Sequence, residues 1–153
     1  MQNANTIGKD KKLIVVIGGG FAGTTLLKSL AKRVPSGYEL VLISEESYTT
    51  FNPMLPEVVG ASIFPEQVVA PIRTMFKPSP NVRFIMGRVT SMDAQEKTLT
   101  CTSLNDECKI HYEHAVMAFG NRAKLDLIPG MAEHALPLKT VGDAMHIRNI
   151  VLR

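Results

Sequence analysis

Apolar and polar positions divide the chain into two kinds of predicted strand. Continuous apolar runs, typical of strands buried on both faces of a parallel sheet, occupy residues 13–17, 39–43 and 115–119. A further strand of this sheet is expected at 82–85. Short alternating segments separated by polar turns predict a three-stranded antiparallel meander, with strands at 88–92, 97–102 and 108–112.

Helical spacing is clearest after the first strand. Residues 21–34 carry apolar side chains at three- and four-residue intervals, and Pro35 and Gly37 stop the helix. A short helix distorted by Pro71 is expected at 66–76. A last helix is expected from Thr140 to the end of the sequence, with an apolar face of Ile147, Ile150 and Val151. The intervening segments are predicted to be a long connection (44–64), a turn (77–80) and an irregular stretch (129–137).

The first three elements define the fold class. Strand, helix and strand fit into the 31 residues from 13 to 43, which predicts a right-handed crossover between parallel strands. The expected fold is therefore α/β, a Rossmann-like three-layer parallel sheet with an inserted three-stranded antiparallel β-meander. Residues 1–12 are predicted to be a flexible tail, and 13–153 a single domain.

Composition narrows the class of protein. The 153 residues are 45% hydrophobic and 20% charged with a net charge of +3, as in a globular domain. Basic residues are interspersed with acids, which argues against a nucleic-acid partner. Apolar runs are too short for a membrane span, and the first residues lack the apolar core of a signal peptide. Cys101 and Cys108 form no CxxC pair, and the four histidines share no metal spacing, so no metal site is expected.

The strongest chemical signal is a glycine motif between the first strand and the first helix. In Gly18-x-Gly20-x-x-Gly23, the first glycine permits a tight turn, the second lets a pyrophosphate approach, and the third allows close packing of helix on strand. The positive end of the helix dipole then faces the anion. The motif in this context predicts a dinucleotide site, the alternative being a glycine-rich turn without a ligand.

A ribose-binding acid is expected at the end of the second strand. Glu45 lies 22 residues after Gly23, so Glu45 or the preceding Ser44 is the candidate to bind ribose hydroxyls. Glu46 is interpreted as a solvated loop carboxylate. Arg73 and Arg88 could each pair with a phosphate. A structural salt bridge is an equally favoured role for each of them.

Beyond the glycines, further segments follow in an order that resembles one family. They are Phe51-x-Pro53-x-Leu55-Pro56-Glu57-Val58, Pro71-Ile72-Arg73, Gly87-x-Val89-x-x-Met92-Asp93, Tyr112 to Gly120, Pro129-Gly130, Leu138-Lys139-Thr140, Asp143-Ala144 and Arg148-Asn149. Together they resemble the N-terminal part of two-dinucleotide-binding flavoproteins of the pyridine nucleotide-disulfide oxidoreductase superfamily. Within these, the chain is most similar to type II NADH dehydrogenases, the single-subunit NADH:quinone oxidoreductases.

The resemblance implies FAD as the cofactor and assigns residues to it. Pyrophosphate contacts would come from Gly18, Gly20, Phe21, Ala22 and Gly23. Glu45 would hold the adenosine ribose, although the family often has an acid where Ser44 falls, so the contact stays open between the two. Val89 would meet the adenine through its backbone. Further FAD contacts are implied for Ala118 and Gly120 near the pyrophosphate, and for Pro53 near the flavin end.

The resemblance also implies a reaction, partners and a location. NADH would be the co-substrate and quinone the acceptor, with no catalytic side chain assigned here. The partner region would be a C-terminal NADH-binding and membrane-contact part, so these residues alone are expected to be inactive and to hold FAD weakly. A homodimer stays open. The location would be cytoplasmic, or peripheral on the inner face of the cell membrane for a full-length protein.

Two alternative functions stay open beside this interpretation. One is another flavin-dependent pyridine nucleotide oxidoreductase, of the sulfide:quinone or ferredoxin reductase type. The sulfide:quinone type is less favoured, because that type carries a reactive cysteine further along the chain and no cysteine follows Cys108 here. The second alternative is a non-catalytic module that binds NAD(P) or ADP-ribose, and the predicted meander argues against it.

Overall fold

The computed structural model describes residues 10–76, 79–103 and 106–153, in two compact units. The first unit contains the described residues up to Thr49 together with Pro71–Gly120, and the second contains Thr50–Ala70 and Asn121–Arg153. The predicted tail falls largely on residues 1–9, and the predicted turn partly on 77–78, all of which lie outside the described residues. Lys12 already belongs to the first strand.

A four-stranded parallel sheet in the order β5-β2-β1-β9 forms the centre of the first unit. Its strands are β1 (Lys12–Ile17), β2 (Tyr38–Ser44), β5 (Val82–Met86) and β9 (His114–Met117). All four were expected, but β9 ends two residues earlier than predicted. The Ala118 N–H still donates to the Ile17 carbonyl (2.7 Å), after which the backbone turns away and reaches a positive φ of 64° at Gly120.

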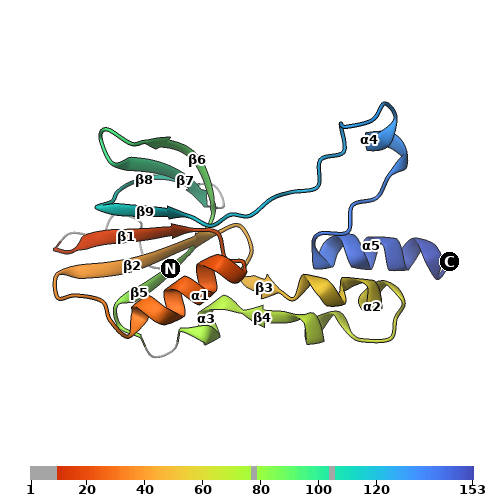
Figure 1. The fold of residues 1–153 in the computed structure, drawn as a ribbon, viewed down its shortest axis with the longest axis horizontal. Helices are drawn as coiled ribbons and strands as arrows, with labels where there is room; N and C mark the ends of the chain where they lie inside the picture. The colour runs from red at the N-terminus through yellow and green to blue at the C-terminus, as the bar shows by residue number, and fades with distance from the viewer. Residues whose placement is uncertain (1–9, 77–78, 104–105) are drawn as a thin grey trace. The chain divides into compact units, whose positions relative to one another are not determined.

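A layer of other elements covers each face of this sheet, which confirms the three-layer prediction (Figure 1). Side chains along the strands alternate between the two faces. Val15 and Val41 point to one face and pack with the meander. Val16 and Leu42 point to the other and pack with Leu27 of helix α1 (Phe21–Ala31). The meander therefore occupies the layer where a plain Rossmann unit would have helices, and both faces of the parallel strands are covered.

Helix α1 is shorter than its apolar spacing predicted. It ends at Ala31 rather than Val34, and the Arg33 N–H closes a turn onto the Leu30 carbonyl (2.8 Å). Pro35 has no N–H to donate and disfavours the helical conformation in the residue before it. Val34 still packs against the cluster around Leu27, so its apolar character is explained without the helix.

The antiparallel meander agrees with the prediction and has the order β6-β7-β8. Its strands are β6 (Arg88–Asp93), β7 (Thr98–Ser103) and β8 (Asp106–His111). The Asp93 carboxylate accepts hydrogen bonds from the Gln95 and Glu96 N–H groups, which fixes the turn between β6 and β7. The other predicted turn includes residues 104–105, which are not described.

The predicted helix at 66–76 is wrong. The segment divides into a 3₁₀ turn η3 (Pro65–Val68), the short strand β4 (Val69–Pro71) and one helical turn α3 (Ile72–Met75). Pro71 has no N–H and adopts an extended conformation, so it separates strand from helix instead of bending one helix. Strand β4 pairs with β3 (Tyr48–Thr50), which lies in the segment expected to be an irregular connection.

The second unit has short elements where the sequence predicted little structure. The 44–64 connection contains the 3₁₀ turn η2 (Asn52–Met54) and helix α2 (Leu55–Val59), and the 129–137 stretch contains α4 (Met131–His134). Thr140, the predicted start, is the N-cap of helix α5 (Val141–Val151). Its hydroxyl accepts from the Asp143 N–H, and the Asp143 carboxylate accepts from the Thr140 N–H.

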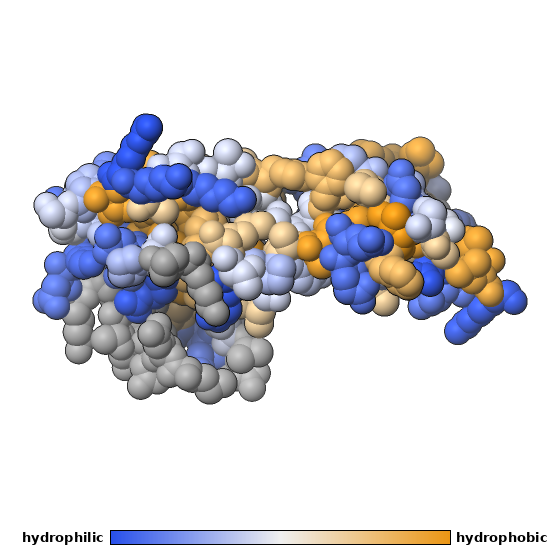
Figure 2. Space-filling view, turned by 90° about the horizontal axis from the view of Figure 1, so that it is seen from below, coloured by the Kyte–Doolittle hydropathy of each residue, from blue (hydrophilic) through white to orange (hydrophobic). Residues whose placement is uncertain are grey.

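The buried face of α5 differs from the predicted one. Val141 and Ala144 are buried against Leu55, Val58 and Val68, whereas Ile150 and Val151 are 49% and 68% exposed. The helix ends at Val151 and does not run on to Arg153. Figure 2 shows the resulting apolar surface over this unit, interspersed with charged side chains.

Candidate functional site

Backbone hydrogen bonds connect the carboxyl ends of the central strands to one another. The Gly18 N–H donates to the Ile43 carbonyl (2.8 Å), and the Gly87 N–H donates to the Ser44 carbonyl (2.8 Å). The Ala118 bond to Ile17 is the third. These bonds bring most of the predicted site residues of the first unit to one edge of the sheet. In open parallel sheets, ligands bind at this carboxyl edge.

Two of the three motif glycines are sterically required. Gly18 has a φ of +113°, and a Cβ there would collide with the Ala118 carbonyl oxygen and stand 2.6 Å from its carbonyl carbon. A Cβ on Gly23 would collide with the Gly18 carbonyl oxygen. Gly23 therefore lets the first turn of α1 lie directly against the end of β1, as the motif predicted.

Gly20 is different, because a Cβ there would meet nothing within 4 Å. The space that a side chain would fill is open at the start of α1, next to the exposed Ala22. Gly20 provides no side-chain cap, and the first helical turn contains no acidic residue. An anion placed here would satisfy the first N–H groups of the helix and interact favourably with its dipole. These residues therefore fit a dinucleotide pyrophosphate.

Gly19 is also sterically required, although the glycine motif did not predict this. A Cβ at Gly19 would stand 2.6 Å from both Ile72 Cδ1 and Ser44 Oγ. Ser44 is 8% exposed and Ile72 is completely buried, so the turn is pressed onto the end of β2 and onto α3. Three consecutive glycines at 18–20 are a signal for this tight packing, whereas the spaced motif marks only the first and third of them.

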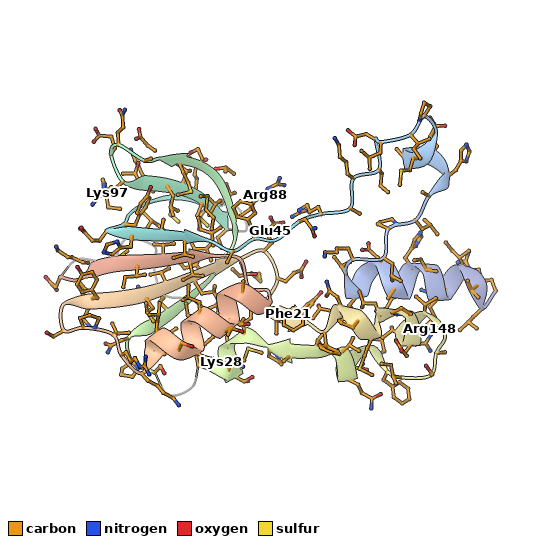
Figure 3. The ribbon with its side chains drawn as sticks, viewed as in Figure 1. Phe21, Lys28, Glu45, Arg88, Lys97 and Arg148 are labelled. Carbon is orange, nitrogen blue, oxygen red and sulfur yellow. The ribbon has the colours of Figure 1, made fainter. Side chains whose placement is uncertain are left out.

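The two candidates for the ribose contact differ in exposure. Ser44 is buried against the turn, whereas the Glu45 side chain is 44% exposed at the edge. Glu45 Oε1 lies 3.9 Å from Nε of Arg88, the first residue of β6. Figure 3 shows this pair side by side at the carboxyl edge, with Phe21 at the start of α1.

The remaining predicted site residues fall in both units. Val89 is half-buried, pairs with Cys101 across the meander and packs on the sheet core. Ala118 is half-buried beside Gly18, and Gly120 is exposed with open space around its α-carbon. Pro53 belongs to η2 of the second unit. The first unit therefore contains every predicted site residue except Pro53.

Cys101 lacks the features of an active thiol. Cys101 is buried in the core between sheet and meander, and its pKa is raised to about 12 by burial and by the neighbouring Cys108. Within residues 10–76, 79–103 and 106–153, no group of three or more His, Cys, Asp or Glu side chains could hold a metal ion. None of the helices described in those ranges is long and apolar enough to span a membrane.

A parallel sheet with a glycine turn before α1 and a meander on the opposite face defines a Rossmann-like flavoprotein-type fold. The family model for pyridine nucleotide-disulphide oxidoreductases matches residues 12–152, so the chain belongs to this family. The name of the family describes oxidoreductases of pyridine nucleotides and disulphides.

Individual relatives agree with this family. The mitochondrial external alternative NAD(P)H-ubiquinone oxidoreductase B2 of Arabidopsis thaliana is 32% identical over 152 residues, covering 95% of this chain and 26% of that protein. The sulfide:quinone oxidoreductase of Aquifex aeolicus superposes with a TM-score of 0.75 at 26% identity, covering 92% of this chain and 32% of that one. NDH2 of Plasmodium falciparum has the same fold, with a TM-score of 0.78 at 24% identity over 90% of this chain and 28% of that one. The chain thus spans about a quarter of the length of the curated relatives it matches.

Proposed function

We propose that residues 13–153 are the FAD-binding part of a type II NADH:quinone oxidoreductase. The observation that carries the proposal is the open, uncapped start of α1 at Gly20, in a chain that aligns over 95% of its length with a relative named as an NAD(P)H-ubiquinone oxidoreductase. An open anion site of this kind is what a bound dinucleotide requires.

The pyrophosphate of FAD would lie against the glycine turn. Gly18 and Gly23 hold the turn close to the sheet, and the backbone of Gly20, Phe21 and Ala22 would face the phosphates. The Thr24 hydroxyl donates to the Gly20 carbonyl (2.8 Å), which keeps that carbonyl within the first helical turn and away from the anion. Preformed backbone donors bind an anion with little reorganisation.

The adenosine would extend from the turn towards β2 and β6. We assign the ribose hydroxyls to Glu45 rather than Ser44, because the Glu45 carboxylate is exposed while Ser44 is packed under Gly19. The Val89 backbone would meet the adenine. Ala118 and Gly120 would line the other side of the pyrophosphate, and Pro53 would approach the flavin end.

When bound, FAD supplies the two-electron carrier that connects NAD(P)H oxidation to quinone reduction. The residues of this chain bind and orient it, and no side chain here is assigned to the chemistry itself. Cys101 is unsuited to a thiol relay, since its sulfur is buried and its pKa is raised to about 12. That observation favours a quinone-reducing enzyme over a dithiol-dependent one in the same family.

The full enzyme would require partners that these residues do not supply. They are a C-terminal region that binds NADH and contacts the membrane, and the quinone itself. Relatives of this chain are named as external mitochondrial enzymes. The peripheral membrane location that we propose for the complete protein rests on the family resemblance. We expect residues 13–153 to show no NADH:quinone turnover alone and to bind FAD more weakly than the complete enzyme does.

Titration of the chain with FAD and with NADH, followed by flavin fluorescence and calorimetry, tests the proposal. FAD should bind in equimolar amount and more tightly than NADH, and Gly20→Ala should weaken FAD binding because the methyl group occupies the open anion site. Gly142→Ala is the matched control, since its added methyl group lies in α5 with only an ordinary contact to Thr140. Tighter binding of NADH than FAD would indicate a nucleotide module of another kind.

A further inference from the structure

We infer that Arg73 is a positioning residue of the dinucleotide site. Its guanidinium lies over the ring of Phe84 and holds the helical turn α3 on the sheet, and α3 in turn keeps the glycine turn in the form that binds an anion. The effect on FAD rests on the proposed function. The contact with Phe84 is neither the phosphate contact nor the salt bridge that the sequence suggested for this arginine.

Helix α3 is a single turn that depends on contacts with the rest of its unit. It has four residues, Ile72–Met75, whereas isolated helices shorter than about 12 residues are marginal in water. The Ile72 N–H donates to the Ser47 carbonyl (2.9 Å), and the Ile72 side chain is completely buried. Both contacts act on the first residue of α3. The Thr74 hydroxyl donates to the Pro71 carbonyl (2.8 Å) within the same turn, so this bond does not connect α3 to the sheet.

Arg73 connects the exposed side of α3 to the sheet. Its Cζ lies 5.2 Å from the centre of the Phe84 ring, inside the limit of about 6 Å for a cation–π contact. Phe84 belongs to β5, pairs with Leu42 of β2 and packs in the same apolar cluster as Ile72. The guanidinium therefore holds α3 to a ring whose position is fixed by the sheet.

Ile72 transmits this restraint to the glycine turn. A Cβ on Gly19 would stand 2.6 Å from Ile72 Cδ1, so α3 packs directly on the turn. Gly18, on one side of Gly19, donates its N–H to the Ile43 carbonyl (2.8 Å). Gly20, on the other side, has open space where the anion would lie. A displaced α3 would therefore release the turn next to the anion site, and donors that must reorganise bind an anion less tightly.

A double-mutant cycle of Arg73→Gln and Phe84→Leu, with FAD affinity measured by titration, tests the inference. Arg73→Gln should weaken FAD binding by about two- to fivefold, as expected for an exposed cation–π contact. Arg73→Lys should lose less, because it keeps a cation. In the Phe84→Leu background, Arg73→Gln should have no further effect, whereas an arginine in direct contact with a phosphate would act equally with or without the ring.

Arg33→Gln is the matched control for charge. It removes the same charge from an exposed position beyond the end of α1 and should leave FAD affinity unchanged. Circular dichroism and chemical denaturation show whether each variant is folded under the conditions of the titration.

The NMR signal of the Gly19 amide separates positioning of the turn from a general loss of stability. In the folded chain without FAD, Arg73→Gln should shift this signal, whereas Arg33→Gln should not. The inference is overturned if Arg73→Gln leaves the Gly19 signal or the FAD affinity unchanged, or if its effect on affinity persists in full without the Phe84 ring. A chain that binds no FAD would refute the proposed function, and the Gly19 signal alone would then decide whether Arg73 acts on the turn.

Discussion

The α-carbon of Gly23 lies so close to the carbonyl oxygen of Gly18 that no side-chain carbon fits between them. This contact joins the first turn of α1 to the end of β1, and Val16 Cγ1 would be 3.4 Å from the same added carbon. Gly23→Ala should therefore push the helix from the sheet and destabilise the fold by about 1–3 kcal/mol. Chemical denaturation followed by circular dichroism measures this loss.

Gly20→Ala separates folding from binding at the same turn. The added methyl group meets no atom within 4 Å and the backbone φ of −79° suits any residue, so stability should fall by less than about 1 kcal/mol. FAD affinity should fall in this variant even though the chain remains folded. Equal destabilisation by Gly20→Ala and Gly23→Ala would contradict the different packing of the two glycines.

The sequence predicted those elements that depend on local pattern. The parallel strands and the meander follow from apolar runs and alternation, and the α5 start follows from Thr140 and the residues after it. The short elements α2 and η3 were missed because Leu55, Val58 and Val68 acquire their buried positions from packing against α5, which is distant in sequence. Strand β4 was missed because it depends on pairing with β3. The exposure of Ile150 could not be inferred from helical spacing for the same reason.

The candidate site also combines features that local sequence predicts with features that depend on packing between distant residues. The glycine spacing predicted the turn, but our proposal of Glu45 rather than Ser44 for the ribose rests on the packing of Gly19 onto Ser44. Adjacent residues on a strand end differ in exposure according to what covers them, and spacing along the chain carries no information about that. The proximity of Arg88 to Glu45 depends on the pairing of β2 with β5, which also links residues far apart in sequence.

Gly19 provides a prediction about coupling. Gly19→Ala brings a methyl group to 2.6 Å from Ile72 Cδ1 and should cost about 1–3 kcal/mol of stability. Ile72→Val alone should cost about 0.5–1.5 kcal/mol, because it leaves a small cavity. The double variant should lose less than the sum, since valine removes the colliding methyl group. Additive losses in a double-mutant cycle would show that Gly19 does not press on Ile72.

The N-terminus of α5 should be sensitive to acid. Burial alone would raise the pKa of Asp143, but hydrogen bonds from Lys139 and Thr140 outweigh it and lower that pKa below its ordinary 3.8. A lowered folded-state pKa contributes stability that is complete above the unfolded value and is lost as the pH falls through the folded one. Asp143→Ala should cost about 1 kcal/mol near neutral pH and progressively less below pH 3.8.

Hydrogen exchange of the α5 amides across this pH range measures the effect. The Asp143→Ala variant and the unmodified chain should converge in protection at low pH, where the Asp143 carboxyl group of the unmodified chain is protonated and no longer charged. Thr140→Ala is the companion variant, because it removes the hydroxyl that accepts from the Asp143 N–H but leaves the carboxylate in place. Its cost should therefore depend less on pH, and an identical pH profile for both variants would argue against the role of the carboxylate.

The two thiols should differ in reactivity although they face each other across β7 and β8. Cys101 is completely buried and its pKa is raised to about 12, whereas Cys108 is half-buried. Only thiolates react readily with disulfide reagents, so at about pH 8 Cys101 should stay unmodified in the folded chain. Thiol titration should count at most one reactive group before denaturation and two after it. Cys108→Ser should abolish the reaction of the folded chain, and rapid modification of Cys101 in that variant would reopen a thiol-dependent mechanism.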